Sequence, residues 1–435
     1  MAQFRKDSHR YLDQEKTIFE VVMLADQYGN LVGPANPSGA AVDAFGRARM
    51  SQPLTLFDSF HRYRENDKWN TSNTNTGTST YTYNANSSFI SMSVTTANGA
   101  NVLRETTKTF AYQPGKSLQI LNTFNMAPAQ TGLTQKVGYF GTQNGVYLEQ
   151  ADSTVSFVIR SYSTGSLVED RINQPSWNID KLDGTGPSLL TLDLTKSQIF
   201  WTDIEWLGVG TVRCGFVIEG RMIHCHSFHH ANETTGTYMT TACLPLRAEI
   251  YNTANTGNGS TMNLICSTVI SEGGYDLRGD QYTIGQLPNT PYTLTTAGVF
   301  YPVVAIRLRS DRSDAIVIPT NFSVLGLTGN GTRIAYKIVD GATVTGGTWV
   351  NADTYSAIQY NITANTFTGG KSYTQAFQAV NNQGSVAAGA FGRDIFRHQL
   401  QRNTFTAANT VLVLAVAGAG AGDTCIASLD WEEIT

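Results

Sequence analysis

Charged side chains are scarce in this sequence. They make up 15% of its 435 residues, against about 25% in an ordinary globular chain. The 30 Lys and Arg residues nearly balance the 34 Asp and Glu residues, so the formal net charge is only −4, and like charges form no block. Because proteins that bind nucleic acid concentrate positive charge, we expect no nucleic-acid partner.

The sequence also lacks long apolar runs and CxxC motifs. Its longest apolar run, Val411–Val416, is far shorter than the roughly 20 residues of a membrane-spanning helix, so we expect no membrane insertion. Residues 1–10 mix charges without an apolar stretch, which predicts that the chain has no signal peptide and is made in a cytoplasm. The odd number of cysteines favours buried thiols in a reducing compartment over a disulfide framework. They are Cys214, Cys225, Cys243, Cys266 and Cys425.

What the sequence does contain is typical of a large β-rich core. Apolar residues make up 41% and aromatic residues 10% of the chain, which argues against intrinsic disorder. Alternating apolar segments recur at short intervals, with neither a helical period nor a long repeat. We therefore predict an all-β chain, an antiparallel β-sandwich or jelly roll of the lectin or viral-coat type, with an extended N-terminal arm.

Turn residues between alternating segments predict two hairpins. In both, a dipeptide with glycine in second place would form the turn, because glycine tolerates positive φ. The hairpins join residues 138–143 to 146–149 across Asn144-Gly145, and residues 211–218 to 221–228 across Glu219-Gly220.

Two polar stretches predict long loops. Between Asn70 and Asn98 only Phe89–Val94 alternates, and Asp353–Tyr373 is polar and shows no strand pattern.

The chain divides into three predicted regions. Residues 1–53 form an anchor arm and linker, with a strand at Thr17–Ala25 and two prolines in 33–39. Residues 54–287 form the sandwich body. Residues 288–435 form a second β-rich region, which belongs either to the same sandwich or to a separate one.

Four of the seven histidines lie between His224 and His230. On a strand, His224 and His226 share a face, and together with His229 or His230 they would supply three nitrogen ligands for zinc. The absence of an acidic partner or a CxxC at metal spacing favours histidines that hydrogen-bond across strands or face solvent. We therefore predict no metal site.

No catalytic motif is present, so we expect no enzyme, no catalytic residue and no cofactor. Candidate acids for glycan hydrolysis are Asp203, Glu205, Glu219 and Asp280. Asp203 and Glu205 share a strand face, but a hydrolase needs two carboxylates that flank a cleft. Their default interpretation is structural.

The aromatic residues divide by their surroundings. Those on predicted strands are expected in the core: Trp201, Trp206, Tyr139, Phe140 and Tyr147. Three tryptophans in polar segments are the better candidates for contact with a glycan: Trp69, Trp177 and Trp349.

Distinctive stretches run through residues 17–290. They are Phe19–Asn30, Ala44–Tyr63, Ala111–Leu118, Lys136–Gly141, Leu182–Pro187, Ile204–Gly210 and Cys266–Tyr275. In sequence these stretches resemble virion structural proteins of tailed phages, especially marine and cyanobacterial phages. Phe19–Asn30 is similar to leaders that precede different bodies in other cyanophage virion proteins, which suits a modular attachment device.

The resemblance implies a protein made in the host cytoplasm and located in the virion. Capsid decoration or a short head fibre is the first interpretation, and a tail or baseplate component is the second. A lectin-like adhesion protein at the tail tip, which would hold a host surface glycan, is an alternative of a different class. A polysaccharide depolymerase is the least favoured alternative.

We expect the arm to bind neighbouring capsid or tail subunits by strand addition and apolar burial, in a homo-oligomer for which a trimer is favoured. The candidate interface residues are Ile18, Phe19, Val21, Met23, Phe45, Arg47 and Leu54.

Overall fold

The computed structural model describes most of the chain beyond Gln52. Residues 51–73, 79–327, 333–380, 398–403, 405 and 409–434 are described in full, and strand residues 10–12, 18–20, 24–25, 31–32, 74 and 387–390 through their backbone. The chain divides into two compact units, residues 1–52 and 53–435. In the first unit, two pairs of short strands run antiparallel, β1 (Arg10–Leu12) with β2 (Ile18–Glu20) and β3 (Leu24–Ala25) with β4 (Leu31–Val32).

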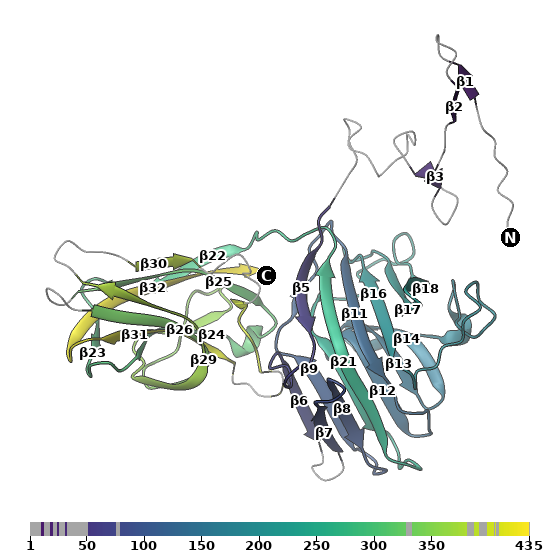
Figure 1. Ribbon diagram of the computed structural model, residues 1–435, viewed down its shortest axis with the longest axis horizontal. Coiled ribbons are helices and arrows are strands. Elements are labelled where there is room, and N and C mark those ends of the chain that lie inside the picture. Colours follow the sequence, from purple (N-terminus) through teal and green to yellow (C-terminus); the bar gives the residue numbers. More distant parts are fainter. Residues whose placement is uncertain are drawn as a thin grey trace. The chain divides into compact units, whose positions relative to one another are not determined.

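Residues 54–271 form a sandwich of two antiparallel sheets, which we call the first sandwich (Figure 1). One sheet has eight strands: β18 (Arg221–Phe228), β17 (Val212–Ile218), β16 (Gln198–Ile204), β11 (Leu118–Asn125), β21 (Ser260–Ser271), β8 (Phe89–Val94) and β7 (Ser79–Asn84), with β5 (Leu54–Ser59) also paired to β21. The other has seven: β15 (Val168–Asn173), β14 (Thr154–Ser161), β13 (Gly145–Ala151), β12 (Leu133–Phe140), β20 (Leu246–Asn252), β9 (Asn101–Thr106) and β6 (Trp69–Thr74). A small pair, β10 (Phe110–Ala111) and β19 (Cys243–Leu244), completes it.

Residues 280–434 form the second sandwich, which has its own hydrophobic core. Its first sheet contains β22 (Asp280–Gly285), β32 (Asp423–Ile434), β25 (Ile316–Gly326) and β30 (Ala387–Ala390), with β23 (Tyr292–Leu294) paired to β32. Its second sheet contains β27 (Val350–Asn351), β28 (Ile358–Asn361), β24 (Tyr301–Leu308), β31 (Val411–Gly418), β26 (Arg333–Thr345) and β29 (Thr366–Ala379). Since β22 already pairs with β32, the change of sandwich falls before Asp280 and not near residue 287 as expected.

The predicted fold class, an all-β chain of antiparallel sandwiches, is confirmed. Within the described residues, helical structure is limited to the 3-10 turns η1 (Gln174–Ser176) and η2 (Ser310–Arg312) and to His398, which is also in a 3-10 turn. No helix in that part of the chain has the length and apolar character needed to cross a membrane. All five cysteines are free thiols.

The two predicted hairpins form, but only one has the predicted turn. Between β17 and β18, Glu219 and Gly220 both have positive φ, at 52° and 72°, as a two-residue type I′ turn requires. Between β12 and β13, Phe140 lies opposite Gly145, so the loop is residues 141–144. Gly145 starts the strand, and any Cβ there would overlap with the Phe140 side chain.

The two predicted long loops are wrong. The stretch 70–98 contains most of β6 and all of β7, and the stretch 353–373 contains β28 and the first half of β29. β6, β7 and β29 lie at sheet edges. β29 exposes most residues on both faces, and β7 exposes one face fully and Tyr81 on the other. Edge strands that bury little apolar surface need no regular alternation of apolar residues, so the two-residue pattern does not reveal them.

Aromatic stacking fills the first core. Trp177 is 2% exposed and lies flat on Phe157, with 4.1 Å between ring centroids and 16° between planes. Phe200 stacks on Phe157 from the opposite sheet, at 5.7 Å. Trp349 in the second sandwich is half-buried, with the Arg307 guanidinium 4.1 Å from its ring centre.

Segment 398–403 connects the two sandwiches. Leu400 belongs to the second core, whereas the Arg402 backbone N–H donates to the Thr107 carbonyl of the first sandwich at 2.9 Å. The Arg402 guanidinium also pairs with Glu105, a carboxylate only 2% exposed. Loss of either partner would leave a buried charge, so this pair fixes the joint.

Lys108 lies at the same joint and is buried. Burial, together with the nearby charge of Lys68, lowers the pKa of Lys108 to about 7, against the opposing effect of Asp340. An unfolded chain holds a lysine with a pKa of about 10.4. Between these values the unfolded chain binds a proton that the folded chain lacks, so this group adds stability as the pH rises from 7 towards 10.

We therefore expect wild-type protein to gain stability relative to Lys108→Met between pH 7 and pH 9, by about 1–3 kcal/mol. Urea unfolding of both proteins at each pH measures the difference. Lys196→Met, which changes an exposed lysine, is the control and should run parallel to the wild type. Parallel behaviour of Lys108→Met as well would contradict the assignment.

We expect Trp177→Ala to lower the free energy of unfolding by about 3–5 kcal/mol, because it empties a stacked, fully packed site. Trp349→Ala should cost about 1–2 kcal/mol, since it removes a half-buried ring and one cation–π contact. Urea denaturation followed by circular dichroism compares the two. Equal costs would show that Trp177 is not a core residue.

Candidate functional site

The four candidate acids separate in space. Glu219 lies in the exposed β17–β18 turn and pairs with Arg221 at 3.2 Å. Asp280 begins β22 in the second sandwich, opposite Glu433. Only Asp203 and Glu205 come together, in the wall of one pocket on the first sandwich.

Strand alternation puts Asp203 in this pocket. Its neighbours Thr202 and Ile204 point into the core and are at most 1% exposed, so Asp203 points to the outer face. Arg213 lies directly opposite it on β17, and its Nη2 pairs with Asp203 Oδ2. Asp203 is nevertheless 5% exposed, and this burial raises the pKa of its carboxyl group against the effect of Arg213.

Glu205 follows at the end of β16 and is exposed. Its backbone N–H donates to the Thr211 carbonyl at 3.1 Å, and the Thr211 N–H donates to Glu205 Oε2 at 3.4 Å. Residues 205–211 thus form a closed loop between β16 and β17. Gly210 is required in this loop, because a Cβ there would overlap with the Glu205 carbonyl.

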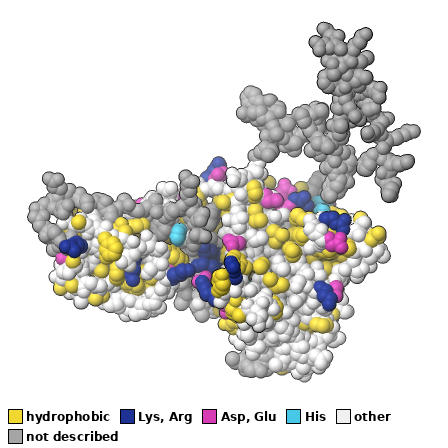
Figure 2. Space-filling model, viewed as in Figure 1, with side chains coloured by type: hydrophobic (Ala, Val, Ile, Leu, Met, Phe, Trp, Pro, Cys, Tyr) yellow, Lys and Arg dark blue, Asp and Glu magenta, His cyan; other side chains and the backbone are white. Residues whose placement is uncertain are grey.

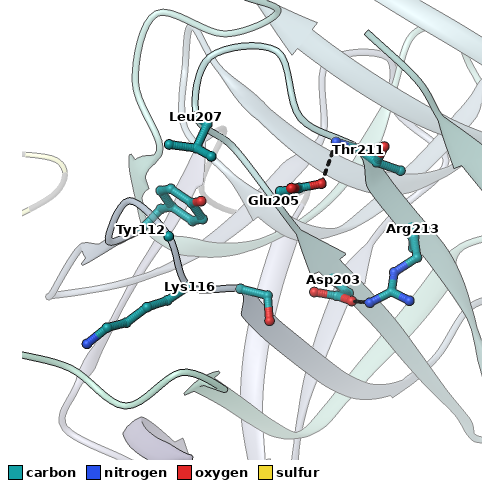
Figure 3. A pocket seen from close by; sticks show the side chains of 9 residues that line it. Tyr112, Lys116, Asp203, Glu205, Leu207, Thr211 and Arg213 are labelled. Atoms are coloured by element: carbon teal, nitrogen blue, oxygen red, sulfur yellow. Dashed lines mark hydrogen bonds and ion pairs between the residues drawn. The ribbon is translucent and has the colours of Figure 1, made fainter. Parts of the chain in front are cut away.

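The loop before β11 supplies the opposite wall (Figure 3). The Tyr112 ring lies along this wall with its hydroxyl buried against the 206–207 backbone, and Lys116 extends away to Asp276, at 3.2 Å. The cavity measures about 480 Å³, within the range of small-ligand sites. Its lining residues are Tyr112, Gly115, Lys116, Ser117, Asp203, Glu205, Leu207, Thr211 and Arg213.

Two buried polar atoms beside the pocket, Asp203 Oδ1 and the indole Nε1 of Trp206, have no hydrogen-bond partner among the described residues. The Tyr112 hydroxyl is buried there too and accepts from the backbone N–H groups of Gly115, Trp206 and Leu207. Trp206 packs against Tyr112, with 6.3 Å between ring centroids. These polar atoms have less than 1 Å² of accessible surface, so they lie behind the pocket wall and a ligand in the cavity contacts the exposed groups in front of them.

The charges in the pocket are already paired. Arg213 pairs with Asp203 and Lys116 pairs with Asp276, so Glu205 is the charged lining residue that has no ion-pair partner among the described residues. The wider surface is also poor in charge: on the face that Figure 2 displays, charged side chains are few among uncharged ones.

The histidines of the 224–230 cluster are engaged individually. His224 Nε2 lies 3.0 Å from Ser227 Oγ, and His226 Nδ1 accepts the Asn178 N–H at 3.2 Å. Burial lowers the pKa of both, that of His226 to about 4. His229 lies 3.3 Å from Thr211 Oγ1, beside the pocket. Among the residues that the structure describes, no three His, Cys, Asp or Glu side chains are placed to hold a metal ion.

The tryptophan expectations need correction. Trp69 and Trp177 are 6% and 2% exposed, so neither presents a face to a glycan. Both lie in polar sequence because they belong to, or directly follow, edge strands, and their rings turn inwards. One face of Trp349 is covered by Arg307. Of the aromatics expected in the core, Trp206 alone is half-buried, while Trp201, Tyr139, Phe140 and Tyr147 are buried.

Most of the predicted assembly interface lies outside the described residues: Val21, Met23, Phe45 and Arg47. Ile18 and Phe19 are described through the backbone of β2, where they pair with Leu12 and Tyr11. Leu54 begins β5 and is 38% exposed.

Sequence reasoning missed Tyr112, Leu207 and Arg213 as pocket residues. The position of Arg213 could have been predicted, because the first strand of the predicted 211–228 hairpin (β17) directly follows β16 in the sequence, and consecutive strands commonly pair. The position of Tyr112 depends on a contact between segments some ninety residues apart, as its 6.3 Å approach to Trp206 shows, and no local pattern encodes it.

Neither a protein-family model nor a curated protein matches this sequence. Several solved structures share its β-sandwich architecture at low similarity. A Bacteroides ovatus GH16 protein of a mixed-linkage glucan locus, in complex with a G4G4G3G product, is 11% identical, with a TM-score of 0.35 over 49% of this chain and 99% of its own. Bacillus licheniformis β-glucanase is 12% identical, with a TM-score of 0.31 over 49% and 97%. Arcelin-5, a lectin-like defense protein from Phaseolus vulgaris, is 9% identical, with a TM-score of 0.29 over 51% and 99%. These likenesses concern the fold alone.

Proposed function

We propose that the first sandwich is a carbohydrate-binding module that holds a glycan in the Asp203 pocket and does not cleave it. The observation that carries this proposal is an open cavity of about 480 Å³ whose lining combines the exposed Glu205 carboxylate with the Arg213 guanidinium and the Leu207 side chain. Sugar hydroxyls are both donors and acceptors, so they suit a wall that mixes carboxylate oxygens with a guanidinium.

Charge balance favours a sugar over an anion. A phosphate or sulfate group binds best to unpaired Arg or Lys side chains. Here Arg213 and Lys116 are already paired with carboxylates. An uncharged polyhydroxylated ligand can bind without breaking either pair.

Binding without cleavage follows from the placement of the two acids. Glycoside hydrolysis needs two carboxyl groups presented to the same glycosidic bond. Glu205 is exposed, whereas Asp203 is buried and held by Arg213. Only one carboxylate is therefore presented to a bound sugar.

We further propose, from the sequence resemblance, that the module is displayed on a phage particle and mounted through residues 1–53. This arrangement joins the two interpretations of the sequence, since a displayed sandwich that binds host glycan is both a structural and an adhesion protein.

We expect Glu205→Gln to weaken glycan binding at least tenfold, because it replaces the exposed charged acceptor by a neutral amide. A glycan array identifies the ligand, and calorimetry on the full chain measures the affinity. Glu219→Gln, the same change in a remote exposed turn, is the control and should bind like wild type. If no glycan is retained, or if both variants behave alike, the proposal fails.

The same ligand tests the absence of cleavage. Incubation with wild-type protein should release no reducing ends. Release that Glu205→Gln abolishes would replace the binding assignment by a hydrolase.

Deletion of residues 2–30 should leave a folded protein that no longer enters the particle. Circular dichroism checks the fold, and particle composition after infection with the deletion phage checks incorporation. Normal incorporation would contradict mounting through the arm.

A further inference from the structure

The two edges of the seven-stranded sheet differ in how they are protected. β15 forms one edge and carries Glu169, Asp170 and Arg171, and charged side chains keep foreign strands from pairing with an edge. β6 forms the other edge, and its sequence, WNTSNT, contains neither a charged residue nor a proline. Its six residues pair with β9 in an unbroken register. The free side of β6 is therefore suited to accept a further strand.

The register of β6 shows which of its backbone groups face the free side. The Thr107 N–H donates to the Lys68 carbonyl at 2.8 Å, so these two residues form a hydrogen-bonded pair of the ladder. Hydrogen-bonded and non-hydrogen-bonded pairs alternate between antiparallel strands, and Thr71 thus lies opposite Arg104 in a non-hydrogen-bonded pair. The Thr71 N–H and carbonyl point away from β9, and the described part of the chain gives them no backbone partner.

A cavity of about 640 Å³ follows this free edge. Its lining includes the five consecutive residues 69–73, whose side chains alternate between the two faces of the sheet. A cavity on one face would meet only every second residue, so this one must extend around the edge of the strand. At about 3.3 Å per residue, the lined stretch has room for an extended segment of about five residues.

An aromatic ring reaches the cavity from each side of the sheet. Tyr81 of β7 lies opposite the core residue Met92, so its side chain points to the inside of the sandwich. Phe405 follows Arg402, which pairs with Glu105 on the outer face of β9. Both rings line the cavity and are 39% exposed. Successive side chains of an extended peptide would therefore meet one ring and then the other.

The charges in the lining are neutralised within the protein. Glu65 pairs with Arg104 at 2.6 Å, and Asp67 pairs with Arg64 at 3.1 Å. The other polar side chains of the lining are amides and hydroxyls. An uncharged ligand can therefore bind here without breaking an ion pair.

We propose that the free edge of β6 binds an extended, uncharged peptide segment of a partner protein, which adds a strand to the seven-stranded sheet. The Thr71 N–H and carbonyl form the central pair of hydrogen bonds with it, and two successive side chains of the peptide pack on Tyr81 and Phe405. In strand addition the backbone supplies affinity and the alternate side chains supply specificity. The site shares no lining residue with the Asp203 pocket, so this inference goes beyond glycan binding and does not depend on it.

A matched pair of variants tests the role of the β6 backbone. The probe is a peptide selected on the full chain from a display library of random hexapeptides without charged residues, and fluorescence anisotropy measures its affinity. Thr71→Pro should weaken binding at least tenfold, because proline lacks the outward N–H but is tolerated at a sheet edge. Thr71→Val is the control. It also loses the hydroxyl that binds Arg104 but keeps the N–H, so it should bind like wild type.

Hydrogen exchange of the wild-type protein tests the same site without a variant, and it decides if circular dichroism shows that Thr71→Pro does not fold. The selected peptide should slow amide exchange in residues 69–73 and leave residues 168–173 of β15 unchanged. A selection that yields no binder, equal affinities in all three proteins, or protection only at other residues would overturn the proposal. Protection of residues 69–73 by the glycan from the array, without any peptide binder, would assign the edge to a sugar and overturn it as well.

Discussion

The two-residue period of β16 is the constraint on which the pocket depends. Thr202 and Ile204 face the core. Asp203 lies between them on the strand, so its side chain must point to the outer face. The antiparallel register then sets Arg213 directly opposite, and the pair satisfies one oxygen of a carboxylate that is otherwise buried. A shift of β17 by one residue would move Arg213 into the core, so the ion pair and the strand register support each other.

The loop after β16 turns this structural pair into a pocket. Hydrogen bonds between Glu205 and Thr211 close the loop, and Gly210 allows the close approach. The loop thereby exposes Glu205 and Leu207 at a cavity whose opposite wall comes from the loop before β11. Glu205 has no ion-pair partner among the described residues, so its carboxylate is the group that a ligand in the cavity can engage.

Much of the fold could be predicted from the sequence, because buried strands leave a two-residue pattern. The hairpin across Glu219-Gly220 has the predicted turn, since a tight two-residue turn depends only on local φ preferences. The edge strands β7 and β29 could not be predicted, because their backbone pairs on one side only and most of their side chains are exposed, so they lack a regular apolar alternation. The turn predicted at Asn144-Gly145 is wrong because glycine is needed there for another reason. Gly145 lies in β13, and the close approach of Phe140 on the neighbouring strand leaves no room for a Cβ.

The candidate site was predictable only in part. The shared face of Asp203 and Glu205 follows from strand alternation alone, and both residues line the same pocket in the structure. The burial of the tryptophans could not be predicted, because polar neighbours in sequence do not imply exposure: Trp177 follows the edge strand β15 and the turn η1, and its ring stacks on Phe157. Tyr112 and Leu207 gain their roles from tertiary contacts.

A crystal structure of the full chain with the glycan that the array identifies, at saturating concentration, is the most direct test of the central claim. We predict density for a sugar ring in the Asp203 pocket, in contact with the Glu205 carboxylate. A sugar bound at another place on the sandwich, or a pocket that holds only water under these conditions, would contradict it.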